Sequence, residues 1–309
     1  METRQYRQLY LAQNFLRSSR LVRRLVGMSS IALCDTVCEI GAGTGIITAE
    51  LARAAGRVIA IERDARLVRR LRERFGGRAN VEIVEKDFLD YFFAQARMKH
   101  VVEPSLTVGL LTPRSEHVVE PSRTVGLLTP RSEYKIFANI PYNMTAAIVR
   151  KILHVHPLPI EAYLIMQKEA ARKFSGCPRE TLFSILAKPF FEFRILYELR
   201  RTDFCPAPNV DSVLLSINRR PAPLVQMTEE RPYREFVEYG FSRWKPNLKL
   251  AYKHVFSYKQ WKRLAHDLSF PLNARPTELS FAQWLGLYRG FKRLGLDRVS
   301  KEACRVRRS

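Results

Sequence analysis

Residues 39–45 (EIGAGTG) follow an apolar run and open a helical pattern, and this stretch decides the fold. Its glycines let the backbone turn tightly and bring its N–H groups close to a bound ligand. The spacing differs from the G-x-G-x-x-G of dinucleotide-binding proteins, but the acidic residue Glu62, at the end of the next strand, would suit any ribose-bearing ligand. The stretch therefore predicts a strand, loop and helix that hold such a ligand.

Short apolar runs alternate with helical periods on both sides of this stretch. Strands are expected over residues 37–40, 58–62, 81–87, 135–139, 162–166, 193–199 and 212–217, and helices over residues 50–55, 65–75, 145–154 and 168–174. Because strands regularly followed by helices form βαβ units, the sequence predicts an α/β fold with a mainly parallel sheet covered on both faces.

The last third of the chain has a different pattern. After the proline-bearing residues 221–232, helices are expected over residues 233–244, 248–256, 258–268 and 281–294, with no further strands. We therefore expect a domain boundary near residue 220, which separates a larger α/β domain (residues 1–219) from a smaller all-helical domain and tail (residues 220–309).

The chain is strongly basic. Its 52 Lys and Arg against 30 Asp and Glu give a net charge of +22, which suits a nucleic-acid partner. Residues 220–309 hold 19 basic and 8 acidic residues, so the smaller domain carries +11 of this charge. Its basic residues interleave with aromatic ones, as in residues 241–245 (FSRWK) and 258–263 (YKQWKR). Such a composition can neutralise phosphates and stack on bases, with packing into a core as the alternative for the aromatic rings.

No apolar run reaches the roughly 18 residues that a membrane span needs, so we expect a soluble, cytoplasmic protein with no membrane partner. Residues 1–30 hold six Arg and one acid, as a transit peptide would, but residues 16–26 also have the apolar period of an amphipathic surface helix. Five scattered cysteines favour reduced thiols over disulfides. Cys34 and Cys38 lack a second close pair or a nearby His, so we expect core residues and no metal site.

A tandem repeat interrupts the α/β pattern. Residues 100–116 (HVVEPSLTVGLLTPRSE) recur as residues 117–133 with one difference, where Leu106 becomes Arg123. Two copies are too few for a solenoid, which needs three or more units. We therefore interpret residues 100–133 as an inserted, duplicated surface loop, with a functional contact as the alternative.

Polar and aromatic residues follow two of the expected strands. Asp87-Phe88 ends the third strand, where a carboxylate can accept from an exocyclic amine while an aromatic ring covers a flat ligand. Residues 139–142 (NIPY) end the fourth strand. In an open α/β sheet these positions lie along the carboxyl edge, where ligands bind.

In this order the motifs resemble those of the S-adenosylmethionine-dependent adenine-N6 methyltransferases of ribosomal RNA. Residues 13–16 (QNFL) and 204–212 (FCPAPNVDS) match two further motifs of that superfamily. Residues 233–291, particularly 279–288 (LSFAQWLGLY), resemble its erythromycin-resistance (Erm) branch. The resemblance implies a Rossmann-like catalytic domain over residues 1–219 and a helical RNA-binding domain over residues 220–309.

The resemblance also implies S-adenosylmethionine as the cofactor, with Glu62 on its ribose hydroxyls and Asp87 on its adenine amine. The implied cofactor-binding residues are Asn14, Leu16, Gly41, Gly43, Glu62, Asp87 and Asn139. Taken singly, Asn14 and Leu16 would be better explained by a cap or a turn than by a cofactor contact.

Asn139, Ile140, Pro141, Tyr142 and Phe204 are the expected catalytic residues. An adenine amine is a poor nucleophile because its lone pair is delocalised, so acceptors must face its two hydrogens. We assign this role to the Asn139 side-chain oxygen and the Ile140 carbonyl, with Pro141 fixing the backbone. Tyr142 and Phe204 should stack on the two faces of a flipped-out base, with core packing as the alternative.

The resemblance to the Erm branch thus implies an enzyme that methylates an adenine N6 of 23S ribosomal RNA and confers resistance to macrolides, lincosamides and streptogramin B, and we expect it to be a monomer. A small-subunit rRNA dimethyladenosine transferase is one alternative, against which the C-terminal helices argue. A non-catalytic nucleic-acid-binding factor on a methyltransferase fold is another, against which the intact Glu62, Asp87 and residues 139–142 argue. A DNA adenine methyltransferase would usually carry Asp in place of Asn139.

Overall fold

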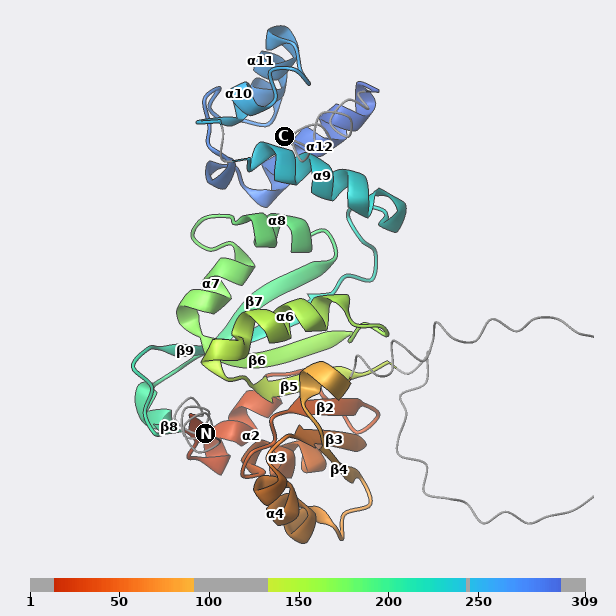
Figure 1. Ribbon diagram of the computed structural model, residues 1–309, viewed down its shortest axis with the longest axis vertical. Helices are drawn as coiled ribbons and strands as arrows, with labels where there is room; N and C mark the ends of the chain where they lie inside the picture. The colour runs from red at the N-terminus through yellow and green to blue at the C-terminus, as the bar shows by residue number, and fades with distance from the viewer. Residues whose placement is uncertain (1–13, 92–132, 243–244, 296–309) are drawn as a thin grey trace, which may run out of the picture. The chain divides into compact units, whose positions relative to one another are not determined.

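The computed structural model describes residues 14–91, 133–242 and 245–295 (Figure 1). The repeat up to residue 132, Gln13 and the tail from residue 296 lie outside the described residues. The chain forms two compact units, which are residues 18–160 (the parallel-sheet unit) and residues 1–17 with 161–309 (the antiparallel-sheet unit).

Parallel strands in the order β4-β3-β2-β5 form the sheet of the parallel-sheet unit (Figure 1). They are β2 (Thr36–Ile40), β3 (Arg57–Glu62), β4 (Val81–Glu85) and β5 (Lys135–Asn139). Residues 58–61 (VIAI) of β3 are at most 1% exposed, as expected of a parallel strand covered on both faces. Because Ile40 pairs with both Ile61 and Ala138, the residues that follow β2, β3 and β5 share one edge of the sheet.

The helices of this unit are α2 (Ser19–Gly27), α3 (Ile46–Ala54), α4 (Ala65–Phe75) and α6 (Thr145–His154). The helix expected over residues 50–55 begins earlier, at Ile46, because Gly45 adopts a left-handed conformation with φ of 79° and ends the glycine loop there. The strand expected to reach residue 87 ends at Glu85. Asp87 therefore lies in the loop after β4, at the carboxyl edge.

The antiparallel-sheet unit contains β6 (Glu161–Gln167), β9 (Ser212–Arg219) and β7 (Phe191–Leu199), in that order across the sheet. β9 runs antiparallel to both neighbours, so the expectation of a mainly parallel sheet is wrong for this half. The reason is the connection between β7 and β9, residues 200–211. It holds only the 3-10 turn η2 (Arg201–Asp203) and the short strand β8 (Phe204–Cys205) and no α-helix, whereas the crossover between parallel strands is usually a helix.

The helices of this unit are α7 (Lys168–Ser175), α8 (Leu182–Ala187), α9 (Glu230–Gly240), α10 (Leu248–Ala251), α11 (Tyr258–Asp267) and α12 (Phe281–Arg293). The sequence missed α8, which is short and begins with a capping box between Thr181 and Ser184. α9 begins before Pro232, since proline is tolerated in the first turn of a helix, and α10 is shorter than expected.

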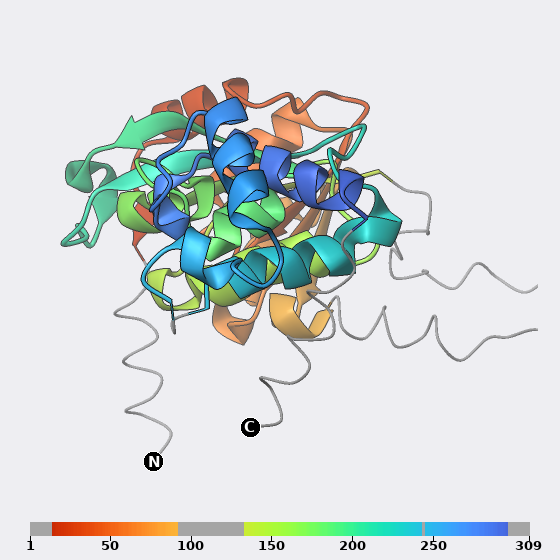
Figure 2. The same cartoon turned by 90° about the horizontal axis from the view of Figure 1, so that it is seen from above.

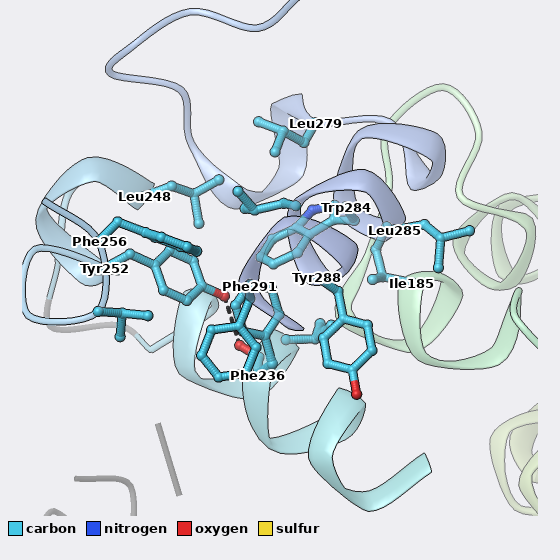
Figure 3. Packing of buried hydrophobic residues seen from close by; sticks show 14 of the residues in the cluster. Ile185, Phe236, Leu248, Tyr252, Phe256, Leu279, Trp284, Leu285, Tyr288 and Phe291 are labelled. Atoms are coloured by element: carbon cyan, nitrogen blue, oxygen red, sulfur yellow. Dashed lines mark hydrogen bonds between the residues drawn. The ribbon is translucent and has the colours of Figure 1, made fainter. Parts of the chain in front are cut away.

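The helices α9 to α12 lie next to one another in both views (Figures 1 and 2) and share an aromatic core (Figure 3). The rings of Phe236 and Tyr252 stack at 4.8 Å, and Phe236 lies 5.0 Å from Phe291. The Tyr252 hydroxyl donates to the Phe236 carbonyl at 2.7 Å, and the indole N–H of Trp284 donates to the Pro276 carbonyl at 3.0 Å. The buried polar groups of Tyr252 and Trp284 thereby have partners, whereas the buried Tyr288 hydroxyl has none among the described residues.

Of the described aromatic residues in and directly before residues 258–263, Phe256 and Trp261 belong to this core and Tyr258 does not. Trp261 is 2% exposed and Phe256 is 3% exposed, whereas Tyr258 is 64% exposed. Packing into the core, the alternative to stacking on bases, is therefore correct for Trp261 and Phe256. Of these three residues, only Tyr258 exposes its ring to solvent.

The compact units do not coincide with the division expected near residue 220. Ile185 of α8 packs into the aromatic core, and its carbonyl accepts a hydrogen bond of 2.9 Å from the buried Tyr233 hydroxyl. A carboxyl oxygen of Glu180 accepts from the backbone N–H of Phe281, which begins α12. These contacts join residues 180–188 to the C-terminal helices, so a boundary at residue 220 would cut through packed structure.

The described helices include none with the length and apolar character needed to cross a membrane. Within the described ranges there is also no cluster of His, Cys, Asp or Glu that could hold a metal ion. Cys38 is buried as expected, but Cys34 is exposed, so its assignment to the core is wrong. Cys34 lies in the loop before β2, which the sheet does not cover.

Gly240 tests the tightness of the aromatic core. A Cβ at this position of α9 would lie 2.5 Å from Cη2 of Trp284 and 2.6 Å from the Tyr252 hydroxyl. We expect Gly240→Ala to lower the free energy of unfolding by about 1–3 kcal/mol, as overpacking does. The matched control is Gly27→Ala at the exposed end of α2, where a Cβ meets no described atom within 4 Å and where helix propensity favours alanine by up to about 1 kcal/mol. Urea unfolding should show changes of opposite sign, and equal losses would contradict the packing argument.

Candidate active site

The glycine loop between β2 and α3 is held against the end of β3. The N–H groups of Gly41 and Ala42 both donate to the Ile61 carbonyl, at 2.8 and 3.2 Å. Gly41, Gly43 and Gly45 have positive φ values of 70°, 57° and 79°, a backbone that other residues rarely adopt. The sequence places glycine at the positions where the turn requires it.

Open space adjoins the first glycine of the loop. A Cβ at Gly41 would meet no described atom within 4 Å, whereas a Cβ at Gly45 would lie 2.7 Å from the ring of Phe75. Gly45 is therefore needed for packing against α4, and Gly41 leaves room at the carboxyl edge for a ligand to approach the backbone.

Glu62, the last residue of β3, is 3% exposed and its carboxylate accepts three backbone hydrogen bonds. The Gly43 N–H donates to Oε2 at 2.9 Å, and the N–H groups of Arg63 and Asp64 donate to Oε1 at 2.8 and 2.9 Å. A carboxylate has about four acceptor positions. One position thus stays available to a further donor at this edge.

Glu39 is a buried carboxyl group directly below the loop, with 1% exposure. Among the residues that the structure describes, neither of its carboxyl oxygens has a hydrogen-bond partner of ordinary length. Burial raises the pKa of Glu39 to about 8; the negative charge of Glu62 raises it too, while the nearby Thr48 opposes the shift. A cationic ligand bound beside this carboxyl group would favour its ionised form and lower the pKa again.

Asp87 lies beyond the end of β4 and is held from two sides. Its Oδ1 accepts from the Leu89 N–H at 2.9 Å, and its Oδ2 accepts from Nη1 of Arg63 at 3.1 Å. The neighbouring Phe88 is 5% exposed, so its ring is buried in this structure.

Residues 139–142 continue from β5 at the same edge. Asn139 is half-buried and Ile140 is 2% exposed. Pro141 has φ of −60° and caps the 3-10 turn η1 (Tyr142–Met144), with its carbonyl accepting from the Met144 N–H at 3.0 Å. This turn holds Tyr142 at the start of η1, where its ring is partly exposed.

The two motifs from the ends of the expected α/β domain meet in the antiparallel-sheet unit. The strand β1 (Phe15–Leu16) pairs with β8, so that Leu16 lies opposite Phe204. The Arg17 N–H donates to the Asp203 carbonyl at 3.0 Å. Asn14 precedes this ribbon and is half-buried, Leu16 is 4% exposed and Phe204 is 1% exposed. Stacking of Phe204 on a base stays a prediction, and it would require this ring to be uncovered.

The structure thus gathers Gly41, Gly43, Glu62, Asp87 and Asn139 at the carboxyl edge of one unit, and Asn14, Leu16 and Phe204 on one ribbon of the other. Sequence reasoning missed two residues of this edge, Arg63 and the isolated carboxyl group of Glu39. The sequence did contain a signal for Arg63. This residue directly follows Glu62 at the end of β3, and the neighbouring strand β4 ends just before Asp87.

Residues 5–292 match the family described as ribosomal RNA adenine dimethylase. The chain belongs to this family. It is an S-adenosylmethionine-dependent methyltransferase of adenine N6 in ribosomal RNA. The match to the structure of a methyltransferase confirms the expected fold class.

Three relatives are similar over most of the chain. The ribosomal RNA small subunit methyltransferase A of Acaryochloris marina is 27% identical over 284 residues, which cover 89% of this chain and 94% of that one. The rRNA adenine N-6-methyltransferase of Aeromicrobium erythreum is 34% identical over 233 residues, which cover 75% of this chain and 58% of that longer one. The crystal structure of the 23S rRNA methyltransferase ErmE matches with a TM-score of 0.73 and 26% identity, over 90% of this chain and 100% of that one.

The residues of the carboxyl edge fit S-adenosylmethionine. This cofactor carries a sulfonium and an ammonium group, either of which would favour the ionised form of the Glu39 carboxyl group. It also carries a ribose whose hydroxyls can donate to the remaining acceptor position of Glu62. A Cβ at Gly41 would meet no described atom within 4 Å, so ligand atoms can approach the backbone there.

The raised pKa of Glu39 predicts a pH-dependent stability. Between its ordinary value of 4.5 and its folded value of about 8, the folded state binds more protons at this group than the unfolded state. The free energy of unfolding therefore falls as the pH rises through this window. Glu39→Gln removes the titration, so its stability relative to the wild type should increase from pH 5 to pH 8 in urea unfolding.

Glu50→Gln is the control. Burial acts to raise the pKa of Glu50, but its hydrogen bonds with Arg23 and Arg53 outweigh burial and hold the pKa below 4.5. Its contribution to stability is therefore complete above pH 5 and is lost only toward more acid pH. The difference between this variant and the wild type should be constant over the same window. If the stability difference between Glu39→Gln and the wild type were also constant from pH 5 to pH 8, the raised pKa of Glu39 would be contradicted.

Proposed function

We propose that this enzyme methylates N6 of one adenine in 23S ribosomal RNA and thereby confers resistance to macrolides, lincosamides and streptogramin B. The observation that carries the proposal is the similarity to ErmE, which extends over 90% of this chain and the whole of that one. The 34% identity to the Aeromicrobium erythreum rRNA adenine N-6-methyltransferase supports it.

Action on small-subunit rRNA is the second candidate. It is favoured by the 94% of the Acaryochloris marina small-subunit methyltransferase that the match covers. The two candidates share a cofactor and a reaction, and they differ only in the RNA that is recognised. The substrate therefore decides between them.

For the cofactor, we assign the ribose hydroxyls to Glu62 and the adenine amine to Asp87. Gly41 and Gly43 would bring the backbone close to the ligand, and Asn139 would border it at the adjoining strand end. Asn14 and Leu16, on the ribbon of the other unit, are proposed to contribute from the N-terminal motif. When bound, S-adenosylmethionine supplies an electrophilic methyl group on a sulfonium.

For the target adenine, we assign the amine to the side-chain oxygen of Asn139 and the carbonyl of Ile140. Two acceptors that face the two N6 hydrogens favour a tetrahedral nitrogen, whose lone pair is free to attack. Pro141 supports this arrangement because it lacks an N–H that could compete for the acceptors, and because η1 holds its carbonyl away in the bond to Met144. Orientation then contributes most of the rate.

The partly exposed ring of Tyr142 is placed to stack on one face of a flipped-out base, and we assign the other face to Phe204. Each stack would contribute about 1–3 kcal/mol. No general base is required, because the N6 proton becomes strongly acidic once the methyl bond has formed and can leave to water.

Exposed basic side chains are suited to hold the RNA backbone. Trp261 and Phe256 point into the core, and the neighbouring Lys253, Lys259 and Lys262 are exposed. They can neutralise phosphates without being part of the pocket. In this proposal the C-terminal helices supply RNA affinity and the carboxyl edge supplies the chemistry.

The substrate is tested with labelled S-adenosylmethionine and two RNAs. We expect the enzyme to label an adenine N6 in protein-free 23S rRNA, at a site where the adenine is unpaired, because flipping costs least there. Small ribosomal subunits are the comparison substrate. Label confined to the small-subunit RNA would make the second candidate correct.

Asn139→Ala tests the assignment of the adenine amine. It should reduce turnover about 100- to 1,000-fold, the effect of removing one aligned polar group from a reacting centre, while RNA affinity changes little. The control is Asn143→Ala, an exposed position of η1 that should methylate at the wild-type rate. Methylation kinetics and filter binding measure the two effects, and a wild-type rate for Asn139→Ala would exclude the role.

A further inference from the structure

The ion pair between Arg63 and Asp87 joins the ends of two parallel strands at the candidate cofactor site. Nη1 of Arg63 lies 3.1 Å from Oδ2 of Asp87, with side-chain exposures of 47% and 27%. Arg63 directly follows β3, and its own N–H donates to Glu62. The Arg63 side chain therefore extends from the residue assigned to the ribose toward the residue assigned to the adenine.

Both carboxylate oxygens of Asp87 have a protein donor in this structure. Oδ1 accepts from the Leu89 N–H, which fixes the orientation of the carboxylate, and Oδ2 accepts from Arg63. Each oxygen keeps a second acceptor position, and a cofactor amine that binds to Oδ2 shares it with the guanidinium or displaces the guanidinium. Displacement is feasible because an exposed ion pair contributes little stability.

A displaced guanidinium has a favourable position close by. It is planar, weakly hydrated and always charged, and it binds well to the face of an aromatic ring. An adenine that donates its amine to Asp87 brings its ring next to the Arg63 side chain, whose backbone is anchored by Glu62. Stacking keeps the guanidinium near the Asp87 carboxylate, so the ion pair is loosened without being lost.

We propose that Arg63 positions the cofactor, its guanidinium holding Asp87 in the free enzyme and covering the face of the adenine ring when the cofactor binds. This inference rests on the proposed assignment of Asp87 to the adenine amine. It adds a cofactor-binding residue that the expected motifs do not contain.

The same two strands provide a matched control. At the opposite end of the sheet, Arg57 of β3 pairs with Glu82 of β4 at 2.8 Å, with side-chain exposures of 41% and 28%. Arg57→Ala therefore removes the same charge and a similar ion pair from the same strands, far along both strands from the carboxyl edge.

The test is isothermal titration of the full-length, cofactor-free protein with S-adenosylhomocysteine, without RNA. Arg63→Ala should weaken binding about three- to fivefold, the effect of losing an exposed cation–π contact, while Arg57→Ala binds like the wild type. Arg63→Lys keeps the charge but not the planar group, so it should restore less than half of the loss in binding free energy. Unchanged or tighter binding by Arg63→Ala would overturn the proposal, since Arg63 would then only occupy Asp87.

Two further measurements separate the possible failures. The thermal midpoints of the free Arg63→Ala and Arg57→Ala proteins should match, which excludes a folding defect as the cause of weaker binding. Asp87→Ala should weaken S-adenosylhomocysteine binding more than Arg63→Ala does. If Asp87→Ala binds normally, the assignment of Asp87 fails and the inference falls with it, whereas the choice between 23S and small-subunit rRNA is unaffected.

Discussion

The carboxylate of Glu62 is the group on which the carboxyl edge depends. It is buried, and it accepts backbone hydrogen bonds from Gly43 in one loop and from Arg63 and Asp64 in the next. A buried carboxylate is stable only when donors surround it, and here those donors are the backbone of the two loops. Glu62 therefore fixes the glycine loop to the end of β3. It also sets the direction in which Arg63 reaches Asp87.

The C-terminal helices are organised by a different constraint, the packing of large aromatic rings. Phe236, Tyr252, Trp284 and Phe291 fill the space among short helices, and the hydroxyl and indole groups each find a backbone carbonyl. Because the rings point inward, the lysines between them point to solvent. The basic surface is thus a consequence of the core, and a change such as Gly240→Ala would disturb both.

The local sequence predicted most of the parallel-sheet unit. Apolar runs and strand-end residues identified β2, β3, β4 and β5, because buried parallel strands are continuous apolar segments. It also identified β7 and β9 as strands but not their antiparallel direction, which goes with a connection that holds no α-helix. It also missed α8, whose six residues are too few for a helical period to be visible and which forms because Ile185 packs among the C-terminal helices.

For the candidate site, the sequence by itself determined which residue types stand at the strand ends: the glycines of residues 41–45, Glu62, Asp87 and residues 139–142. These follow from local patterns, because a glycine turn and a strand end are read within a few residues. Only the tertiary structure decided how their polar atoms are used. In the folded chain the carboxyl group of Glu39 is buried without a hydrogen-bond partner among the described residues, the Glu62 carboxylate accepts hydrogen bonds from two loops, and Arg63 forms an ion pair with Asp87. Those outcomes depend on distances between segments about 20 residues apart, and such distances are set by strand register and burial, which no local pattern records.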